Sequence, residues 1–212
     1  MPDAPAPDPV KLKDVPWCAA LIHAPGTITF IPQSHVTQDG TEVSSQDQLF
    51  RRTLRNDEAI PDCLGFYQDP QILSDGTASD SPFLLSSSSI MFDLRPGVNG
   101  FNGTAHGGLI AALMDESMGA YLYTNDRVYK QKKAEGLLPV ASKGFEDLGF
   151  ATSRMDIRLL KPIRTPQIVV VTSRLAETDG RKVRFSVDVK GKEGKVYATC
   201  DGTWVSFARG RL

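Results

Sequence analysis

The sequence predicts an α+β fold in which one long helix covers one face of an antiparallel sheet. A helical pattern runs from His106 to about Tyr123, segments of alternating apolar and polar residues lie before and after it, and the last strands are joined by tight turns. No other helix is expected in this part of the chain. The helix at 106–123 is therefore expected to cover the sheet.

The composition limits the class of protein. The chain has 212 residues, of which 41% are hydrophobic, enough for one packed domain with an extension. It carries 24 Lys and Arg against 25 Asp and Glu, a net charge of −1. This balance argues against a general nucleic-acid or anionic-membrane binder, because such proteins present a basic surface.

Cysteine and histidine usage predicts neither a disulfide framework nor a metal site. The three cysteines (Cys18, Cys63 and Cys200) are far apart and odd in number, and no Cys/His pair has the spacing of zinc ligands. The longest apolar stretch, 15–22, contains a proline and is too short to span a bilayer. We therefore expect a soluble cytoplasmic protein without a metal.

Residues 1–82 are expected to form an irregular N-terminal extension with one short helix at about 45–56. Pro and Gly interrupt 15–43, whereas Ser45 and Gln48 fit a capping box. Residues 69–82 are rich in Asp, Ser, Gly and Pro, and predict a linker. A domain at 86–207 is expected to follow it.

The domain at 86–207 is expected to begin with a strand at 90–94, a loop at 96–103 and the helix. A polar insertion is expected at 125–147. Four strands then follow, with alternation at 155–159, 168–177, 183–189 and 196–207. Asp179-Gly180 and the run at 191–194 predict tight turns, so the end of the chain is expected to be a meander.

The start of the helix is the segment that carries chemistry. Gly107 and Gly108 follow His106 directly, so a ligand can approach the backbone closely. The first N–H groups of a helix are unpaired and lie at the positive end of its dipole, where they can hold a phosphate or polarise a carbonyl. The alternative is that the glycines form only a tight turn.

Asp115 is the first candidate for a catalytic carboxylate. It follows His106 by nine residues, which is about 900° of rotation and roughly 13 Å along a helix. The two side chains are therefore expected on opposite sides of the helix. If they act on one substrate, a symmetric dimer has to bring them together at its interface.

Glu116 is the second candidate. It falls in the apolar stripe of the helix, where a carboxylate needs a hydrogen-bonding partner or a function. Asp115 lies instead beside Ala111 and Gly119, whose small side chains leave room for a ligand. This pocket argument favours Asp115 as the catalyst.

The stretch HGGLIAALMDESMG, with a Gly/Asn loop before it and a strand ending in LLKPI after it, resembles the hotdog-fold acyl-CoA thioesterases. It is most similar to the phenylacetyl-CoA thioesterase-like branch of the 4-hydroxybenzoyl-CoA thioesterase superfamily. The resemblance covers 86–207. It implies an antiparallel sheet wrapped around one central helix, homodimers formed by joining two sheets, and often tetramers.

The resemblance also implies roles for residues. The Gly107 N–H would polarise the thioester carbonyl, with Gly108 beside it contacting substrate, and Asp115 of the partner subunit would act as general base or nucleophile. A hydroxyl that helps to hold the water would come from Thr152, ten residues before Pro162, or from its neighbour Ser153.

Strand alternation places Thr152 on the same side as Arg154 and Asp156. It is therefore expected to point away from the core, toward a groove near the subunit interface. A purely structural role is the alternative, because Thr favours strands.

Other contacts are less well defined. Relatives often carry Asn or Gln six residues before the motif His. Here Gly100 occupies that position, between Asn99 and Asn102, either of which could serve.

Arg158 and Lys161, near the strand at 155–159, are candidates for the coenzyme A phosphates, although a solvated surface face is the favoured explanation for each. His106 is expected in the site. The alternative is that its ring makes a structural hydrogen bond at the helix start and takes no part in catalysis.

The function expected is hydrolysis of an acyl-CoA thioester to the free acid and coenzyme A, without a cofactor. One alternative is a non-catalytic acyl-CoA or lipid-binding module of the same fold. A hotdog hydratase or dehydratase is the other alternative, but the D-x-N-P-x-H string typical of those enzymes does not occur. The identity of the acyl group is left open.

Overall fold

A computed structural model describes residues 11–35, 47–70, 81–139 and 141–208. The helices are α1 (Pro16–Ile22) and α2 (Gly107–Ala134), with 3-10 turns η1 (Leu12–Asp14), η2 (Gln33–His35), η4 (Pro96–Val98) and η5 (Lys192–Gly194), and a π-helical turn η3 (Leu49–Thr53). The strands are β1 (Thr27–Phe30), β2 (Cys63–Gln68), β3 (Ser87–Leu94), β4 (Asn99–Phe101), β5 (Thr104–Ala105), β6 (Leu148–Leu159), β7 (Gln167–Asp179), β8 (Lys182–Lys190) and β9 (Val196–Ala208).

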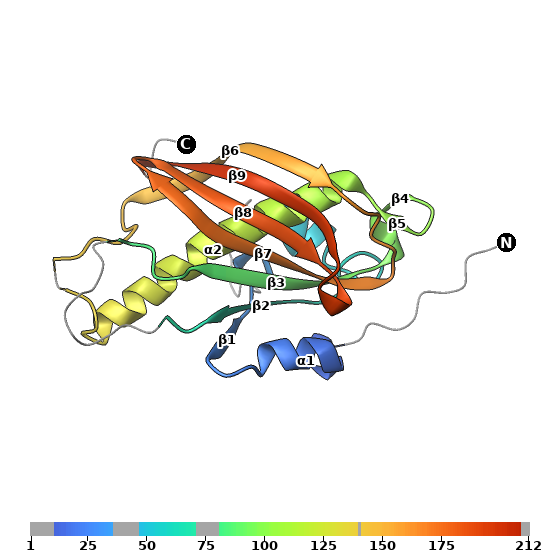
Figure 1. Ribbon diagram of the computed structural model, residues 1–212, viewed down its shortest axis with the longest axis horizontal. Helices are drawn as coiled ribbons and strands as arrows, with labels where there is room; N and C mark the ends of the chain where they lie inside the picture. The colour runs from blue at the N-terminus through green and yellow to red at the C-terminus, as the bar shows by residue number, and fades with distance from the viewer. Residues whose placement is uncertain (1–10, 36–46, 71–80, 140, 209–212) are drawn as a thin grey trace.

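Seven of these strands form one antiparallel sheet in the order β1-β2-β3-β7-β8-β9-β6. The long helix α2 lies along one face of this sheet (Figure 1), which confirms the predicted α+β fold. The meander β7-β8-β9 is also confirmed, with Gly180 at φ +55° in the first turn. Strand β6 pairs only with β9 among the described strands, so it forms an edge of the sheet.

The core lies between α2 and the sheet. Leu113, Met114, Met118 and Tyr121 of the helix are completely buried there. Helix and sheet approach most closely at Gly202 in β9, where an added Cβ would lie 2.3 Å from the Met118 Sδ. The absence of a side chain at this position allows α2 to pack against the strand.

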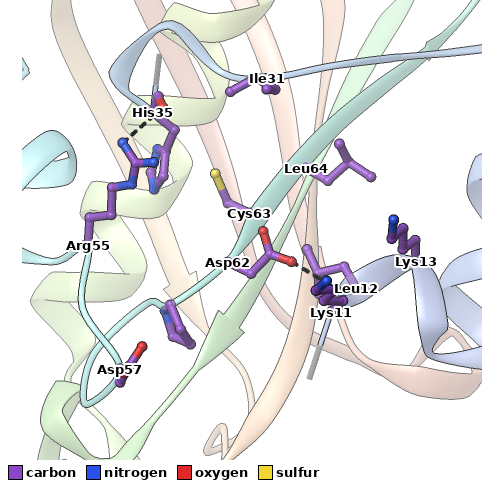
Figure 2. A pocket seen from close by; sticks show the side chains of 11 residues that line it. Lys11, Leu12, Lys13, Ile31, His35, Arg55, Asp57, Asp62, Cys63 and Leu64 are labelled. Carbon is purple, nitrogen blue, oxygen red and sulfur yellow. Dashed lines mark hydrogen bonds between the residues drawn. The ribbon is translucent and has the colours of Figure 1, made fainter. Parts of the chain in front are cut away.

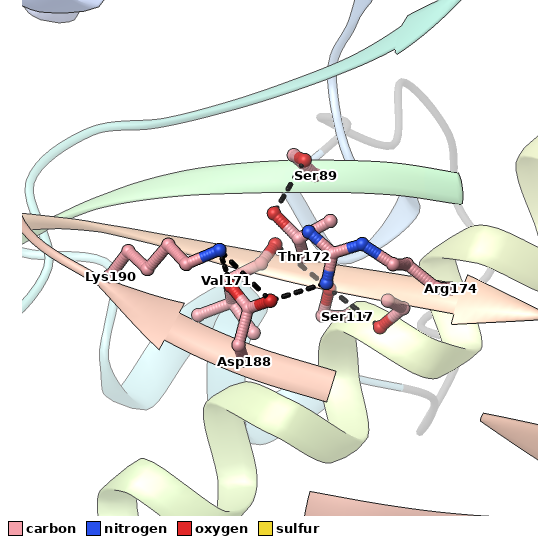
Figure 3. Close-up of polar contacts among 8 residues, drawn as sticks. Ser89, Ser117, Val171, Thr172, Arg174, Asp188 and Lys190 are labelled. Atoms are coloured by element: carbon pink, nitrogen blue, oxygen red, sulfur yellow. Dashed lines mark hydrogen bonds and ion pairs between the residues drawn. The ribbon is translucent and has the colours of Figure 1, made fainter. Parts of the chain in front are cut away.

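Hydroxyl groups supplement this packing (Figure 3). Ser117 of α2 donates to the Val171 carbonyl at 3.3 Å and accepts from Ser173 at 3.1 Å. These contacts satisfy polar groups that burial would otherwise penalise. Elsewhere on the sheet, Asp188 pairs with Arg174 and Lys190.

The helix α2 is longer than the sequence predicts. It continues to Ala134, so the expected polar insertion at 125–147 is wrong for its first ten residues. The reason is that its polar residues are paired: Asn125 is fully buried and accepts hydrogen bonds from the N–H groups of Leu84 and Leu85. Among the described residues, no helix has both the length and the apolar character needed to cross a membrane.

The N-terminal extension is more ordered than expected. Strands β1 and β2 lie within 15–82 and continue the same sheet next to β3, so the extension shares the fold of the following domain. The short helix expected at about 45–56 is a π-helical turn over Leu49–Thr53, and residues 45–46 lie outside the described residues. Most of the predicted linker, 71–80, also lies outside them.

The outer face of the sheet is covered in part by α1. Leu12, Cys18 and Ile22 pack against Met91 and Val170 in a second buried cluster. Irregular structure was expected here because Pro16 interrupts the segment. Pro16 instead occupies the first turn of α1, where its missing N–H has no helical partner to lose.

Candidate active site

The start of α2 presents free backbone donors. His106 is the N-cap, and its Nδ1 accepts a hydrogen bond from the Gly108 N–H at 2.9 Å. A Cβ on Gly108 would lie only 3.0 Å from that Nδ1, so the glycine permits this cap. Within the described part of the chain, the Gly107 N–H has no acceptor, which leaves it available to a ligand.

Asp115 lies two turns further along the helix and faces β6. Its Oδ1 accepts a hydrogen bond from the Thr152 hydroxyl at 2.5 Å. Beside it on the helix, Gly119 leaves space for Trp204, whose ring would lie 3.2 Å from an added Cβ. The two residues that the family resemblance singled out, Asp115 and Thr152, are therefore in direct contact.

The predicted orientation of Thr152 is wrong. A β-bulge lies between Thr152 and Arg154, since Thr152 is opposite Trp204 while Arg154 is opposite Thr203. The additional residue, Ser153, reverses the alternation. Thr152 consequently lies on the helix-facing side of β6, together with Phe150, where it bonds to Asp115, although Thr152 and Ser153 are both exposed to solvent.

Within one chain, the helix start at Gly107 and the carboxylate of Asp115 lie far apart. The eight residues from Gly107 to Asp115 span about 12 Å of helix, too far for one thioester carbonyl to contact both. Asp115 and Gly107 both face the β6 side, because a Cβ on Gly107 would meet Leu159 at 3.0 Å. His106 lines a cavity together with Leu109 and Ala112, and lies apart from Asp115 as expected.

Glu116 has the partner that its position in the apolar stripe requires. Ser34 of η2 donates to its Oε1 at 2.5 Å, and the Ser34 Oγ lies 3.2 Å from the His35 Nδ1. Burial raises the pKa of Glu116 to about 7, with the Ser34 hydrogen bond lowering it and the charges of Asp47 and Asp115 raising it. Burial and the nearby arginines lower the pKa of His35 to about 4, so this imidazole is neutral at physiological pH.

A cavity of about 330 Å³ opens beside the helix start. Its polar end is formed by His106, Gly108 and Asn99, and the rest of its wall is largely apolar. The apolar lining residues are Leu49, Leu54, Val98, Leu109 and Ala112. A polar mouth at a helix start with an apolar interior suits a ligand with a polar head and an apolar chain.

The accessory residues divide into two groups. Asn99 lines the cavity, and its Oδ1 accepts a hydrogen bond from Thr165 at 2.5 Å. Asn102, Arg158 and Lys161 are exposed to solvent, away from any described cavity. Of the expected substrate contacts, the structure therefore brings Asn99 to the helix start.

A larger cavity of about 590 Å³ lies beside β2 and contains neither the helix start nor Asp115. Figure 2 shows two of its charged side chains in hydrogen bonds with neighbouring groups: Arg55 donates to the His35 carbonyl at 3.1 Å, and Asp62 accepts from the Leu12 N–H at 3.2 Å. Burial raises the pKa of the Cys63 thiol, so it stays protonated and is a poor nucleophile.

Sequence reasoning missed the contribution of the extension to this region. Ser34 is 82 residues from Glu116, and nothing local to either residue indicates their contact. Leu49 and Leu54 fall within the short helix expected at about 45–56, but that expectation did not indicate which surface these leucines cover.

Residues 102–198 match the thioesterase superfamily. Verlamelin biosynthesis protein B of Lecanicillium sp. is 30% identical over 189 residues, which cover 85% of this chain and 80% of that protein. Among solved structures, a hypothetical thioesterase with coenzyme A from Streptococcus pneumoniae TIGR4 is 15% identical over 58% of this chain and 82% of its own, with a TM-score of 0.46. The E. coli PaaI protein is 11% identical over 58% and 74%, with a TM-score of 0.45. The chain belongs to the thioesterase superfamily, and its sheet over one long helix is the hotdog fold that the sequence predicted.

Proposed function

We propose that the protein hydrolyses acyl thioesters of coenzyme A. The Gly107 N–H binds the thioester carbonyl, and Asp115 of a second copy takes a proton from water as the water oxygen attacks the carbonyl carbon. The tetrahedral intermediate then collapses, the C–S bond breaks, and Asp115 returns the proton to the sulfur, so that coenzyme A leaves as the thiol and the acyl group as the free acid. Attack by the Asp115 carboxylate itself is the covalent variant of the same reaction.

The observation that carries this proposal is the hydrogen bond from Thr152 to Asp115. The bond fixes the carboxylate through one oxygen and leaves the other free to accept a proton from water. An unpaired backbone donor at the start of the same helix supplies the second requirement, a group that stabilises negative charge on the carbonyl oxygen. Neither proton transfer to Asp115 nor polarisation of the carbonyl by the Gly107 N–H requires a cofactor.

The separation of Gly107 from Asp115 supports a homodimer as the active form. Strand β6 is a 12-residue edge strand, and most of its residues are exposed. Leu159, the last residue of β6, and Leu160 after it are 55% and 53% exposed. A long unpaired edge with exposed apolar residues is the kind of surface that a second sheet covers.

Thiol release from a panel of acyl-CoA substrates tests the proposal. We expect wild-type turnover, and a loss of 100-fold or more in kcat for Asp115→Asn, which keeps the shape but not the basicity of the side chain (on the order of 10²–10⁴ for a general base). Thr152→Val should lower kcat by about tenfold or more, since it frees the carboxylate to rotate.

Glu116→Gln is the matched control, because it neutralises the adjacent carboxylate and keeps an acceptor for Ser34. Full activity of Asp115→Asn would remove this residue from the mechanism. Tight acyl-CoA binding without any turnover would indicate a binding module instead, and hydration of an enoyl-CoA without thiol release would indicate a lyase.

A further inference from the structure

The N-terminal extension contributes one wall of the cavity at the helix start. Leu49 and Leu54 come from η3 and the residue after it, and they face Leu109 and Ala112 of α2 across the cavity. Both leucines lie outside the 102–198 segment that matches the superfamily. This wall therefore comes from a part of the chain that precedes the matched segment.

The extension is fixed in place by several contacts. Ser34 bonds to Glu116, one helical turn beyond Ala112, and Arg51 donates to the Gln33 carbonyl at 3.1 Å. On the other side of the cavity, the Gly97 N–H donates to the Glu58 carbonyl at 2.7 Å, and a Cβ on Gly97 would lie 2.4 Å from that oxygen. These contacts connect the extension, which carries η3, to α2 and to η4, the elements that form the rest of the cavity wall.

The lining of the cavity identifies the chemical class of its ligand. Its described lining residues include no Asp, Glu, Lys or Arg, so a charged acyl group would lose hydration without compensation. Its volume is about 330 Å³. Since a water-sized group occupies roughly 30 Å³, the cavity holds on the order of ten methylene-sized groups.

We propose that this cavity binds the acyl group, that the substrates are thioesters of uncharged apolar acyl groups of medium size (about six to ten carbons), and that Leu54 and Ala112 set that size. The inference rests on the proposed function. In this binding mode the tail of the acyl group lies between η3 and α2, and the thioester carbonyl is held at Gly107. His106 and Asn99 form the polar mouth of the cavity.

The test compares binding and turnover over a chain-length series. S-alkyl-CoA thioethers with two to fourteen carbons cannot be hydrolysed, and calorimetry gives their dissociation constants. The acyl-CoA series gives kcat/KM. For the wild type, affinity should rise about fourfold per methylene and reach a plateau at eight to ten carbons.

Two variants should shift that plateau in opposite directions. Ala112→Leu adds three carbons to the cavity wall and should move the plateau to about six carbons, with a loss of tenfold or more for the ten-carbon ligand and less than threefold for the two-carbon ligand. Leu54→Ala enlarges the cavity and should move the plateau toward longer chains. The matched controls, Ala134→Leu and Leu137→Ala, lie exposed at the far end of α2 and should leave the series unchanged.

The outcomes separate the two proposals. If acyl-CoA is hydrolysed but both cavity variants keep the wild-type chain-length profile, the assignment of the acyl pocket is wrong. If the thioethers bind with the expected chain-length profile, and the two cavity variants shift it as expected, but no thioester is hydrolysed, the assignment of the acyl pocket is confirmed and the proposed function is wrong. A circular dichroism melt of each variant confirms that it is folded.

Discussion

At the scale of single residues, Asp115 and Glu116 show how the environment separates two adjacent carboxylates. Asp115 meets the Thr152 hydroxyl on the side of β6, whereas Glu116 is buried against the extension and bonds to Ser34. Of the two, Asp115 faces the edge strand that a second copy would cover, and Glu116 holds the extension to α2.

The raised pKa of Glu116 predicts a dependence of stability on pH. Its pKa is about 7 in the folded state against an ordinary 4.5, so the folded protein binds this proton more tightly. The contribution is fully present below pH 4.5 and is lost as the pH rises through 7. We expect the free energy of unfolding to fall between pH 5 and pH 8 by about 3 kcal/mol at most from this group.

Urea unfolding of Glu116→Gln at pH 5.5 and pH 8.5 checks this expectation. The variant should lose this part of the pH dependence and be more stable than wild type at pH 8.5. Glu146→Gln, at an exposed position, should retain the wild-type dependence. An identical slope in wild type and Glu116→Gln would show that the buried carboxyl does not titrate in this range.

A buried ion pair gives a second prediction at this scale. Asp93 and Arg95 are 3% and 2% exposed, and Arg95 donates to the Asp93 carboxylate at 2.7 and 3.0 Å. Burial raises the pKa of Asp93, while Arg95 lowers it. Arg95→Leu should cost about 3–5 kcal/mol in the free energy of unfolding, because it leaves a buried carboxylate without a counter-charge.

The control for this pair is Arg174→Leu, which removes a partner of Asp188 from a more exposed pair. That change should cost no more than about 1 kcal/mol. The double variant Asp93→Leu/Arg95→Leu should recover part of the loss. Equal effects of Arg95→Leu and Arg174→Leu in urea unfolding would show that burial does not determine the strength of these pairs.

At the scale of elements, the position of α2 over the sheet depends on Gly202 in β9. An added Cβ would lie 2.3 Å from the Met118 Sδ and 2.9 Å from its Cε. Gly202→Val should therefore destabilise the protein by about 1–3 kcal/mol through overpacking. Thermal unfolding monitored by circular dichroism measures the change.

The second-site variant Met118→Ala makes this prediction specific. Because the two residues are in contact, the loss in the double variant Gly202→Val/Met118→Ala should be smaller than the sum of the single losses. Simple additivity would show that Gly202 is required for another reason, such as the conformation of the strand.

At the scale of the whole molecule, the separation of Gly107 from Asp115 predicts complementation between subunits. Gly107→Pro removes the N–H donor and is compatible with the first helical position, since His106 before it is extended, with φ −65° and ψ 133°. Neither Gly107→Pro nor Asp115→Asn should be active alone. After mixed refolding in equal amounts, about one quarter of the wild-type activity should return, because half of the dimers are mixed and each has one intact site of two.

Thiol release after mixed refolding, compared with each variant refolded alone, measures this recovery. The mixture of Asp115→Asn with Thr152→Val is the matched control. These two residues act from the same chain, so complementation of this pair cannot exceed the residual activity of Thr152→Val. Failure of the first mixture, with dimers present by light scattering, would show that Gly107 and Asp115 do not share a site across subunits.

The succession of elements along 86–207, the central helix and its HGG start could be predicted from the sequence alone, whereas the role of Asp115 stays a prediction. These features depend on local periodicity, turn chemistry and the spacing of a few residues along one helix, all of which are present in the linear sequence. Glu116 was also correctly expected to need a partner, because its place in the apolar stripe follows from helical spacing alone.

Only the tertiary structure decided where Thr152 points, what Glu116 contacts and what covers the cavity. A single additional residue, Ser153, reverses the alternation of β6 and leaves no local signal. The contact of Ser34 with Glu116 and the wall formed by Leu49 and Leu54 join segments more than 50 residues apart. Such contacts are fixed by the packing of the extension onto the sheet and α2, which no local pattern encodes.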